Sequence, residues 1–161
     1  MGSKDVVLAL DNSLDLLTLA LAFEGRLVDE RRVKPLRHTS EVVGRVTSDM
    51  LGERDLTVRD LTCLVVTVGP GSFTGIRVAL AFCKGLREGL SIPLIGLSTL
   101  DVLAQPLSFL DGHYLCPLVD AKKGEVFAAL YRAVGGGLMK MLPERSMKPQ
   151  EVGGILQGPC F

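Results

Sequence analysis

The stretch LVVTVGPGSFTG, from Leu64 to Gly75, joins a short apolar run to a glycine-rich turn and the start of a helical pattern. The apolar run, residues 64–68, predicts a buried β-strand. Glycine and proline at 69–71 break this strand, and a helix is expected to begin at Ser72. The free backbone N–H groups of a helix start attract phosphate and other anions. The stretch therefore predicts a strand–turn–helix unit, whose turn either binds an anion or packs the helix closely on the sheet.

Two nucleotide-binding motifs are disfavoured for this turn. A Walker P-loop needs Gly-x-x-x-x-Gly-Lys-[Ser/Thr], whereas Thr74 stands at the sixth position counted from Gly69. A Rossmann fingerprint needs an acidic residue at the end of the next strand, and the strand expected over 93–97 contains none. Pro70 also removes one N–H group from an anion-binding turn. Residue types alone support close packing and anion binding equally.

The first hundred residues predict the element order βββαβαβα. Strands are expected over 6–10, 16–23, 27–34, 64–68 and 93–97, and helices over 39–50, 72–89 and 99–105. The first three strands form an antiparallel meander because short turns connect them, and helical crossovers then add parallel strands to one edge. This is the α/β order of a ribonuclease-H-like lobe, the building block of actin-like and Hsp70-like ATPases.

A second unit is predicted over residues 111–161, after a first domain of residues 1–110. Its strands are expected over 115–120, 125–132 and 138–142. Pro149 suits the first turn of a helix that would run to about residue 156. The second unit thus repeats the opening of the first and stops after one helix, so a truncated second lobe is expected.

Composition and charge bound the function. Among 161 residues, 18 are Lys or Arg and 18 are Asp or Glu, so the formal net charge is zero. A chain with no net charge is not expected to attract nucleic acid by its own electrostatic potential, so we expect it to act on RNA only through a partner protein. No apolar run predicts a membrane span and no signal peptide is visible, so a cytoplasmic protein is expected.

The sequence offers no catalytic or metal-binding constellation. His38 and His113 stand alone, without the spacing of a metal-binding pair. Ser72 could act as a nucleophile only with a base that cannot be assigned, so helix capping is the favoured role. The cysteines form no Cys-x-x-Cys pair, and reduced thiols are expected rather than a metal site. They are Cys63, Cys83, Cys116 and Cys160.

Two aspartates occupy suggestive positions. Asp11 and Asp120 each end the first strand of a lobe, where actin-like ATPases grip phosphate and position a metal ion and water. A turn-forming hydrogen bond from the carboxylate to nearby backbone is the favoured alternative. The candidate anion or nucleotide contacts are Asp11, Gly69, Gly71, Ser72 and Thr74.

Five segments carry a resemblance to a known family. They are VVLALDNS at 6–13, RHTSEVV at 37–43, VGPGSFTGIRVALAFCKGL at 68–86, PLIGLSTLDVLA at 93–104 and VDAKKGEVFAALY at 119–131. Together they resemble the TsaB (YeaZ) family, inactive relatives of the TsaD/Gcp glycoprotease-like proteins. The combination of GPGSFTGIR with GLSTL is far more specific than a bare glycine pattern.

The resemblance implies a two-lobe actin/Hsp70-like fold without independent catalysis. TsaD transfers threonylcarbamoyl to adenosine 37 of tRNAs that read codons starting with A. TsaB proteins bind and support TsaD, and TsaE, an ATPase, joins the complex. Without TsaD, a homodimer is implied. No intrinsic cofactor is implied, and weak binding of ATP or ADP at the partner interface stays open. The alternative function is an active ATPase, sugar kinase or glycoprotease-like enzyme of the same fold.

The resemblance places the partner contacts on the helices expected over 39–50 and 72–89. Two helices from each partner would form a four-helix interface. The predicted interface residues are Val42, Val46, Met50, Ile76, Arg77, Leu80 and Cys83. Arg77 is the preferred polar contact. Some of the apolar residues must instead face their own sheet, and helical periodicity does not show which.

Overall fold

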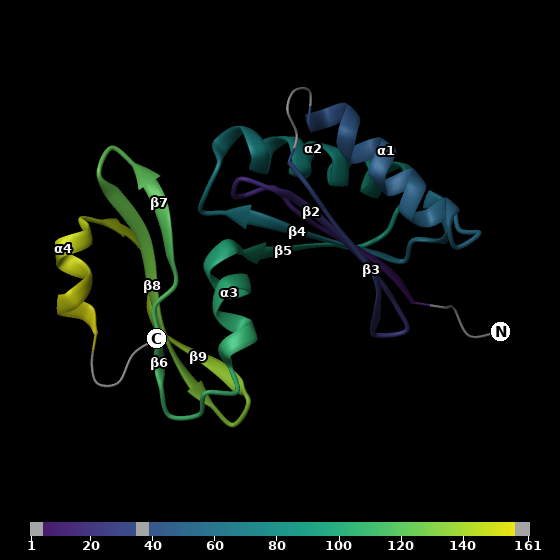
Figure 1. Ribbon diagram of the computed structural model, residues 1–161. Coiled ribbons are helices and arrows are strands. Elements are labelled where there is room, and N and C mark those ends of the chain that lie inside the picture. Colours follow the sequence, from purple (N-terminus) through teal and green to yellow (C-terminus); the bar gives the residue numbers. More distant parts are fainter. Residues whose placement is uncertain (1–4, 35–38, 157–161) are drawn as a thin grey trace. The chain divides into compact units, whose positions relative to one another are not determined.

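The computed structural model describes residues 5–34 and 39–156 (Figure 1). The chain divides into two compact units, Met1–Leu97 and Ser98–Phe161. The division falls earlier than the predicted boundary after residue 110. The reason is that Leu100 and Ala104 of helix α3 (Thr99–Ala104) pack in one cluster with Leu115 and Tyr131, which belong to the second sheet. Helix α3 is therefore part of the second unit.

The first unit is a five-stranded sheet that carries two helices on one face (Figure 1). Its elements are β1 (Val6–Asp11), β2 (Leu17–Phe23), β3 (Arg26–Val33), α1 (Thr39–Gly52), β4 (Cys63–Gly69), α2 (Phe73–Leu90) and β5 (Leu94–Ser98). The sheet order is β3-β2-β1-β4-β5, with β1 antiparallel to β2, β2 antiparallel to β3 and β1 parallel to β4. This order confirms the predicted ribonuclease-H-like lobe.

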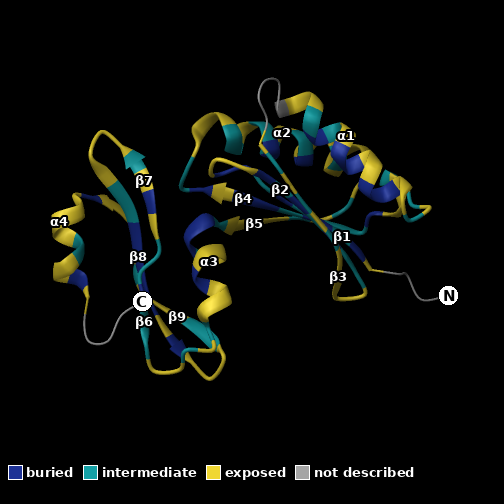
Figure 2. Ribbon diagram, in the orientation of Figure 1, coloured by how far each residue is buried: buried dark blue, intermediate teal, exposed yellow. Residues whose placement is uncertain are grey.

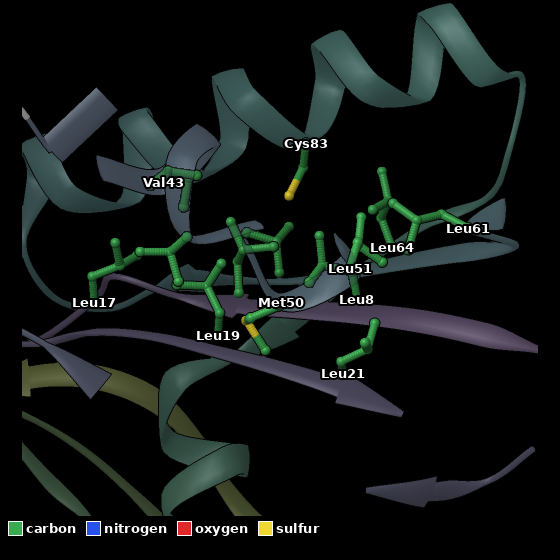
Figure 3. Packing of buried hydrophobic residues seen from close by; sticks show 14 of the residues in the cluster. Leu8, Leu17, Leu19, Leu21, Val43, Met50, Leu51, Leu61, Leu64 and Cys83 are labelled. Carbon is green, nitrogen blue, oxygen red and sulfur yellow. The ribbon is translucent and has the colours of Figure 1, made fainter. Parts of the chain in front are cut away.

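Alternate positions of β1 and β2 build the core beneath the two helices (Figure 3). Burial alternates along both strands, as expected for a sheet with one face packed on helices. Leu8 and Leu19 are fully buried on this face, and Val43 and Cys83 come down from α1 and α2 to meet them. The most apolar stripe of each helix is therefore used inside the first unit.

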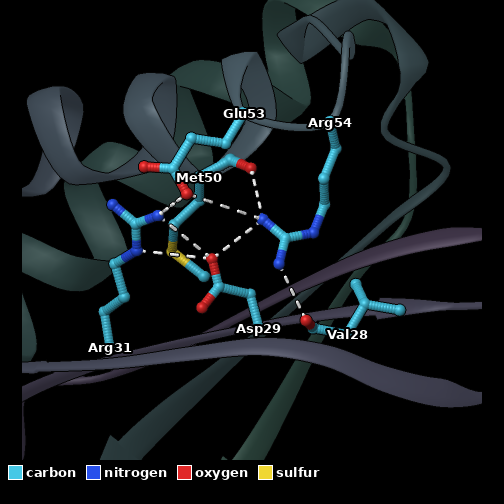
Figure 4. A network of polar contacts seen from close by, with 6 residues as sticks. All are labelled: Val28, Asp29, Arg31, Met50, Glu53 and Arg54. Carbon is cyan, nitrogen blue, oxygen red and sulfur yellow. Dashed lines mark hydrogen bonds and ion pairs between the residues drawn. The ribbon is translucent and has the colours of Figure 1, made fainter.

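An ion-pair network fastens the end of α1 to strand β3 (Figure 4). The carboxylate of Asp29 lies 3.2 Å from Arg31 and 3.0 Å from Arg54. Arg54 also donates to the backbone oxygens of Val28, at 2.8 Å, and Met50, at 3.1 Å. The Met50 carbonyl belongs to the last turn of α1, where backbone acceptors lack helical partners. The network thus caps the helix and fixes its position on the sheet.

In its described residues, 98–156, the second unit contains a four-stranded sheet, two short α-helices and two 3-10 helices. Its elements are α3 (Thr99–Ala104), β6 (Tyr114–Leu115), β7 (Leu118–Lys122), β8 (Glu125–Val134), β9 (Gly137–Met147) and α4 (Pro149–Val152). Strands β6, β7 and β9 all pair antiparallel with β8. The strand predicted over 115–120 is split because Pro117 has no N–H group for the ladder. Strand β9 runs five residues beyond the predicted end at 142. Helix α4 ends at Val152, and a 3-10 helix, η3 (Gly153–Ile155), continues it to about the predicted end at 156.

Candidate functional site

The turn between β4 and α2 packs directly on the turn that follows β1. The N–H group of Ser72 donates to the carbonyl oxygen of Ser13 at 2.6 Å, and the side-chain amide of Asn12 donates to the carbonyl oxygen of Gly75 at 3.1 Å. A Cβ atom on Gly71 would lie 2.1 Å from the Ser13 oxygen, and one on Gly75 would lie 2.0 Å from the Asn12 oxygen. Both positions therefore require glycine for a close approach of backbone to backbone.

Three backbone donors at the start of α2, those of Ser72, Gly75 and Ile76, are used within the protein. Besides the bond from Ser72 to Ser13, the Ser72 hydroxyl accepts from the N–H group of Gly75 at 3.2 Å, and the N–H group of Ile76 donates to the Ser72 carbonyl at 2.9 Å. Ser72 is thus the N-cap of α2, as predicted. Gly69 has a φ angle of +106°, a backbone conformation that favours glycine. These contacts confirm the close packing of the turn, and anion binding at the turn stays a prediction.

The carboxylate of Asp11 is held by three donors. Its Oδ1 atom accepts from the N–H group of Ser13 at 2.9 Å, from the Ser13 hydroxyl at 2.6 Å and from the Thr67 hydroxyl at 2.6 Å. The backbone bond two residues on is the turn-forming bond predicted for this aspartate. Asp120 makes the same bond to the N–H group of Lys122 at 2.7 Å. Both aspartates are therefore turn-forming residues.

A groove lies between the two helices of the first unit. Its cavity volume is about 430 Å³, and the described residues that line it are Ser40, Phe73, Thr74, Arg77, Val78, Ala81 and Phe82. The guanidinium carbon of Arg77 lies 4.0 Å from the centroid of the Phe73 ring, so the two side chains stack. Phe73 is 69% exposed, and the outward positions of α2 are exposed along the helix (Figure 2). The groove thus combines exposed aromatic surface with a positive charge.

Three of the seven predicted interface residues lie in the core instead. Val46, Met50 and Cys83 are each at most 8% exposed and pack beneath the helices, so the prediction that they face a partner is wrong. The sheet and a partner both require an apolar stripe, and the sheet takes the stripe that contains these residues. Burial raises the pKa of the Cys83 thiol to about 11.

The other four predicted residues have mixed positions. Val42 and Leu80 are half-buried and pack against the core. Ile76 is half-buried and its Cδ1 atom would lie 3.2 Å from a Cβ atom on Gly69, so its side chain faces the glycine turn. Of the seven, Arg77 is exposed and lines the groove.

Sequence reasoning missed most of the groove. Phe73, Val78 and Phe82 line it but were not among the predicted contacts. The available signal was the spacing of Phe73 and Arg77, because residues four apart lie on one face of a helix. Thr74, predicted as an anion contact, is exposed and lines the groove as well.

Within residues 5–34 and 39–156, no group of three or more His, Cys, Asp or Glu side chains is arranged to hold a metal ion. The Nδ1 atom of His113 lies 3.3 Å from the carbonyl oxygens of Leu110 and Asp111. His38 and Cys160 lie outside the described residues. No helix in the described part of the chain has the length and apolar character needed to cross a membrane.

The sheet order and the packed glycine turn define the class of protein, an α/β protein built on an actin-like, ribonuclease-H-like lobe. A family described as "TsaD: tRNA N6-adenosine threonylcarbamoyltransferase" matches residues 34–159. Together with the relatives described next, this match shows that the chain belongs to the TsaB (YeaZ) family, within the TsaD-like group.

The chain is similar to the tRNA threonylcarbamoyladenosine biosynthesis protein TsaB of Bacillus subtilis, with 31% identity over 88% of this chain and 61% of that protein. The corresponding Escherichia coli protein is 32% identical over 82% of this chain and 57% of that protein. The solved structure of YeaZ from Pseudomonas aeruginosa is 28% identical, with a TM-score of 0.81 over 96% of this chain and 72% of that chain. The chain spans about three-fifths of the length of these curated relatives.

Proposed function

We propose that this protein is a non-catalytic subunit in the biosynthesis of threonylcarbamoyladenosine in tRNA, where it binds TsaD and supports a complex with TsaE. The relatives named TsaB support the pathway. The observation that carries the proposal is the groove between α1 and α2, with Phe73 exposed and Arg77 stacked on it. Exposed aromatic and arginine side chains beside an apolar hollow are typical of the residues that dominate protein interfaces.

The glycine turn supports a subunit rather than an independent enzyme. The N–H groups of Ser72 and Gly75 are bound to Ser13 and to the Ser72 hydroxyl, and the Asp11 carboxylate accepts from Ser13 and Thr67. The turn therefore sets the position of α2, and α2 presents the groove. In this proposal TsaD carries the chemistry, and tRNA is contacted only indirectly.

Two further features of the proposal concern nucleotide and self-association. ATP or ADP, if bound, is held weakly at the partner interface and not by this chain alone. In the absence of TsaD the same helices form a homodimer. Calorimetry with ATP on the protein alone and on the complex tests the first feature. Light scattering over a range of protein concentrations tests the second.

The experiment that tests the main proposal combines the protein with its cognate TsaD and TsaE. Complex formation is measured by light scattering on a size-exclusion column, and modified adenosine in tRNA is measured by mass spectrometry. We expect a complex, and modification that depends on this protein. No complex, or full modification without this protein, would overturn the proposal. Turnover of Mg-ATP by the isolated protein that is lost in Asp11→Ala would favour the alternative, an active ATPase or kinase.

A further inference from the structure

We propose that the outer edge of β5 (Leu94–Ser98) binds an extended, acidic segment of another protein, which adds to the five-stranded sheet of the first unit as a sixth strand. This surface is the edge of the sheet and is separate from the groove between α1 and α2. The inference therefore goes beyond the proposed function and does not depend on binding to TsaD.

The backbone of β5 is open to pairing on one side. Because β5 is the last strand in the order β3-β2-β1-β4-β5, no strand in the described part of the chain pairs with its outer edge. On the inner side, the carbonyl oxygen of Pro93 accepts from the N–H group of Leu64 in β4 at 2.9 Å. Backbone groups of successive residues in a strand point to opposite sides, so those of Leu94 and Gly96 point away from β4. They offer donors and acceptors to a further strand.

Strand β5 lacks the charges that protect an exposed edge. The strand at the opposite edge of the sheet, β3, has the sequence RLVDERRV, which is rich in charged side chains. By contrast, β5 has the sequence LIGLS and carries no charge. It is largely exposed (Figure 2), with Ile95 at 48% and Leu97 at 39%. Charged side chains are a usual means by which proteins prevent pairing at an edge. An uncharged edge with exposed apolar side chains is therefore suited to accept a strand.

A hollow beside the start of β5 selects the charge of that strand. Its cavity volume is about 690 Å³, and it is lined by Lys84, Arg87 and Glu88 of α2 together with Pro93 and Leu94. Arg87 and Glu88 pair with each other at 3.0 Å. Among the described residues, no carboxylate lies within ion-pair distance of Lys84. The hollow thus retains one uncompensated positive charge, which favours an acidic occupant.

The hollow and the groove between α1 and α2 lie on different sides of α2. Phe82 lines the groove and faces α1, since a Cβ atom on Gly44 would lie 3.9 Å from its ring. Arg87 follows Phe82 by five residues, which rotates its side chain about 140° around the helix at 3.6 residues per turn. Of the described residues that line the two features, none lines both.

The two faces of the edge define the sequence pattern of the occupant. Successive side chains of a strand point to opposite faces of the sheet. Leu94 packs against the core beneath the helices, so one face of an added strand lies beside Lys84. The other face lies beside Ile95 and Leu97. The occupant is therefore an extended segment in which acidic residues alternate with apolar ones.

The edge strands of a second copy do not offer this pattern. A second β5 carries no acidic residue, and it would bring a second Lys84 to the same edge. In β3, the carboxylates of Asp29 and Glu30 are already paired with arginines at 3.2 Å or less. In β9, Glu144 is paired with Lys140 at 3.3 Å. The edge of β5 therefore fits a different protein better than a second copy.

The test measures binding of a synthetic peptide to the full chain. The probe is an end-blocked, fluorescently labelled peptide of eight residues in which valine alternates with glutamate, and binding is followed by fluorescence anisotropy. We expect saturable binding that weakens as salt is added. Hydrogen exchange followed by mass spectrometry should slow in residues 94–98 when the peptide is present.

Two control peptides separate the backbone contacts from the charge. The same peptide with N-methyl groups on alternate residues keeps its side chains but loses backbone donors, so it should show no measurable binding. A peptide of alternating valine and lysine keeps the strand-forming pattern but reverses the charge, and it should also fail to bind.

A pair of protein variants tests the role of Lys84. Lys84→Glu should weaken binding of the acidic peptide by about 3- to 10-fold, the effect of replacing an exposed attraction with a repulsion. The matched control is Arg45→Glu, which makes the same change in net charge at an exposed position of α1 and should bind as the unmodified protein does. Because both side chains are exposed, thermal melts of the two variants should match that of the unmodified protein.

Four results would overturn the inference. Absence of saturable binding by the acidic peptide would show that the edge does not accept such a strand. Equal binding of the N-methylated peptide would show that no strand is added. Equal binding of the lysine peptide, or an unchanged affinity in Lys84→Glu, would show that the edge does not select an acidic partner. If exchange in residues 94–98 slows with rising protein concentration in the absence of peptide, the occupant is a second copy.

Discussion

Replacing Gly75 with alanine should destabilise the first unit, although alanine is the better helix former. A Cβ atom at this position would lie 2.0 Å from the backbone oxygen of Asn12 and 3.1 Å from the Ser72 hydroxyl. Contacts below about 3 Å force movement, and here the obstacle is backbone, which cannot rotate away as a side chain can. The turn after β1 and the start of α2 must separate, and the bond from the Asn12 amide to the Gly75 carbonyl is weakened.

The magnitude follows from these contacts. Overpacking a closely packed site costs about 1–3 kcal/mol, and the weakened hydrogen bond adds about 1 kcal/mol. The gain in helix propensity offsets up to about 1 kcal/mol. We therefore expect Gly75→Ala to lower the free energy of unfolding by about 1–3 kcal/mol.

Gly85→Ala provides the matched control. Gly85 lies on the same helix and is exposed, and a Cβ atom there would have nothing within 4 Å. This variant should be more stable than the unmodified protein by about 0.5–1 kcal/mol. Urea unfolding followed by far-ultraviolet circular dichroism measures both. If Gly75→Ala proves as stable as Gly85→Ala, the claim that residue 75 must be glycine to let the Asn12 backbone approach is wrong.

Two further variants probe the polar networks of the two units. Arg54→Ala removes the ion pair with Asp29 and the cap on α1, and should lower the free energy of unfolding by about 1–3 kcal/mol. The control, Arg45→Ala, replaces an exposed arginine of α1 and should change the free energy of unfolding little. Equal urea midpoints for the two variants would contradict this prediction. In the second unit, burial alone would raise the pKa of Asp101, but hydrogen bonds from the Lys140 ammonium and the Tyr131 hydroxyl outweigh it and hold that pKa below 3.8. The ionised Asp101 carboxylate therefore stabilises the fold fully above its unfolded-state pKa, and this stabilisation is lost as the pH falls through its folded-state pKa. Acidification below about pH 4 should thus lower the urea midpoint of the unmodified protein more than that of Asp101→Asn.

Caps and turns were predicted correctly where both partners of the hydrogen bond lie within a few residues of each other. Ser72 caps the helix that follows it, and Asp11 and Asp120 each accept from backbone two residues on. The strand order also followed from the connections, since short turns give antiparallel neighbours and helical crossovers give parallel ones.

Predictions failed where two partners compete for one feature. Val46 and Met50 of α1 and Cys83 of α2 lie on apolar helix faces that could pack on the sheet or on another protein. Helical periodicity shows that a face is apolar but does not show which surface covers it. The strand predicted over 115–120 was correct except for its interruption at residues 116–117, where Pro117 has no N–H group to donate. The groove residues Phe73 and Phe82 were overlooked, although the four-residue spacing of Phe73 and Arg77 places those two side chains on one face of the helix.

By itself, the sequence determined the glycine turn, the helix that follows it and the family. The role of the turn was decided only by tertiary structure. Gly71 and Gly75 must be glycine because the backbone of Asn12 and Ser13, some sixty residues earlier in the chain, lies against them. Likewise, Arg77 is exposed and lines the groove, whereas Ala79 and Cys83 of the same helix are buried in the core beneath it. Both outcomes depend on which distant surfaces meet, and a one-dimensional pattern does not specify that.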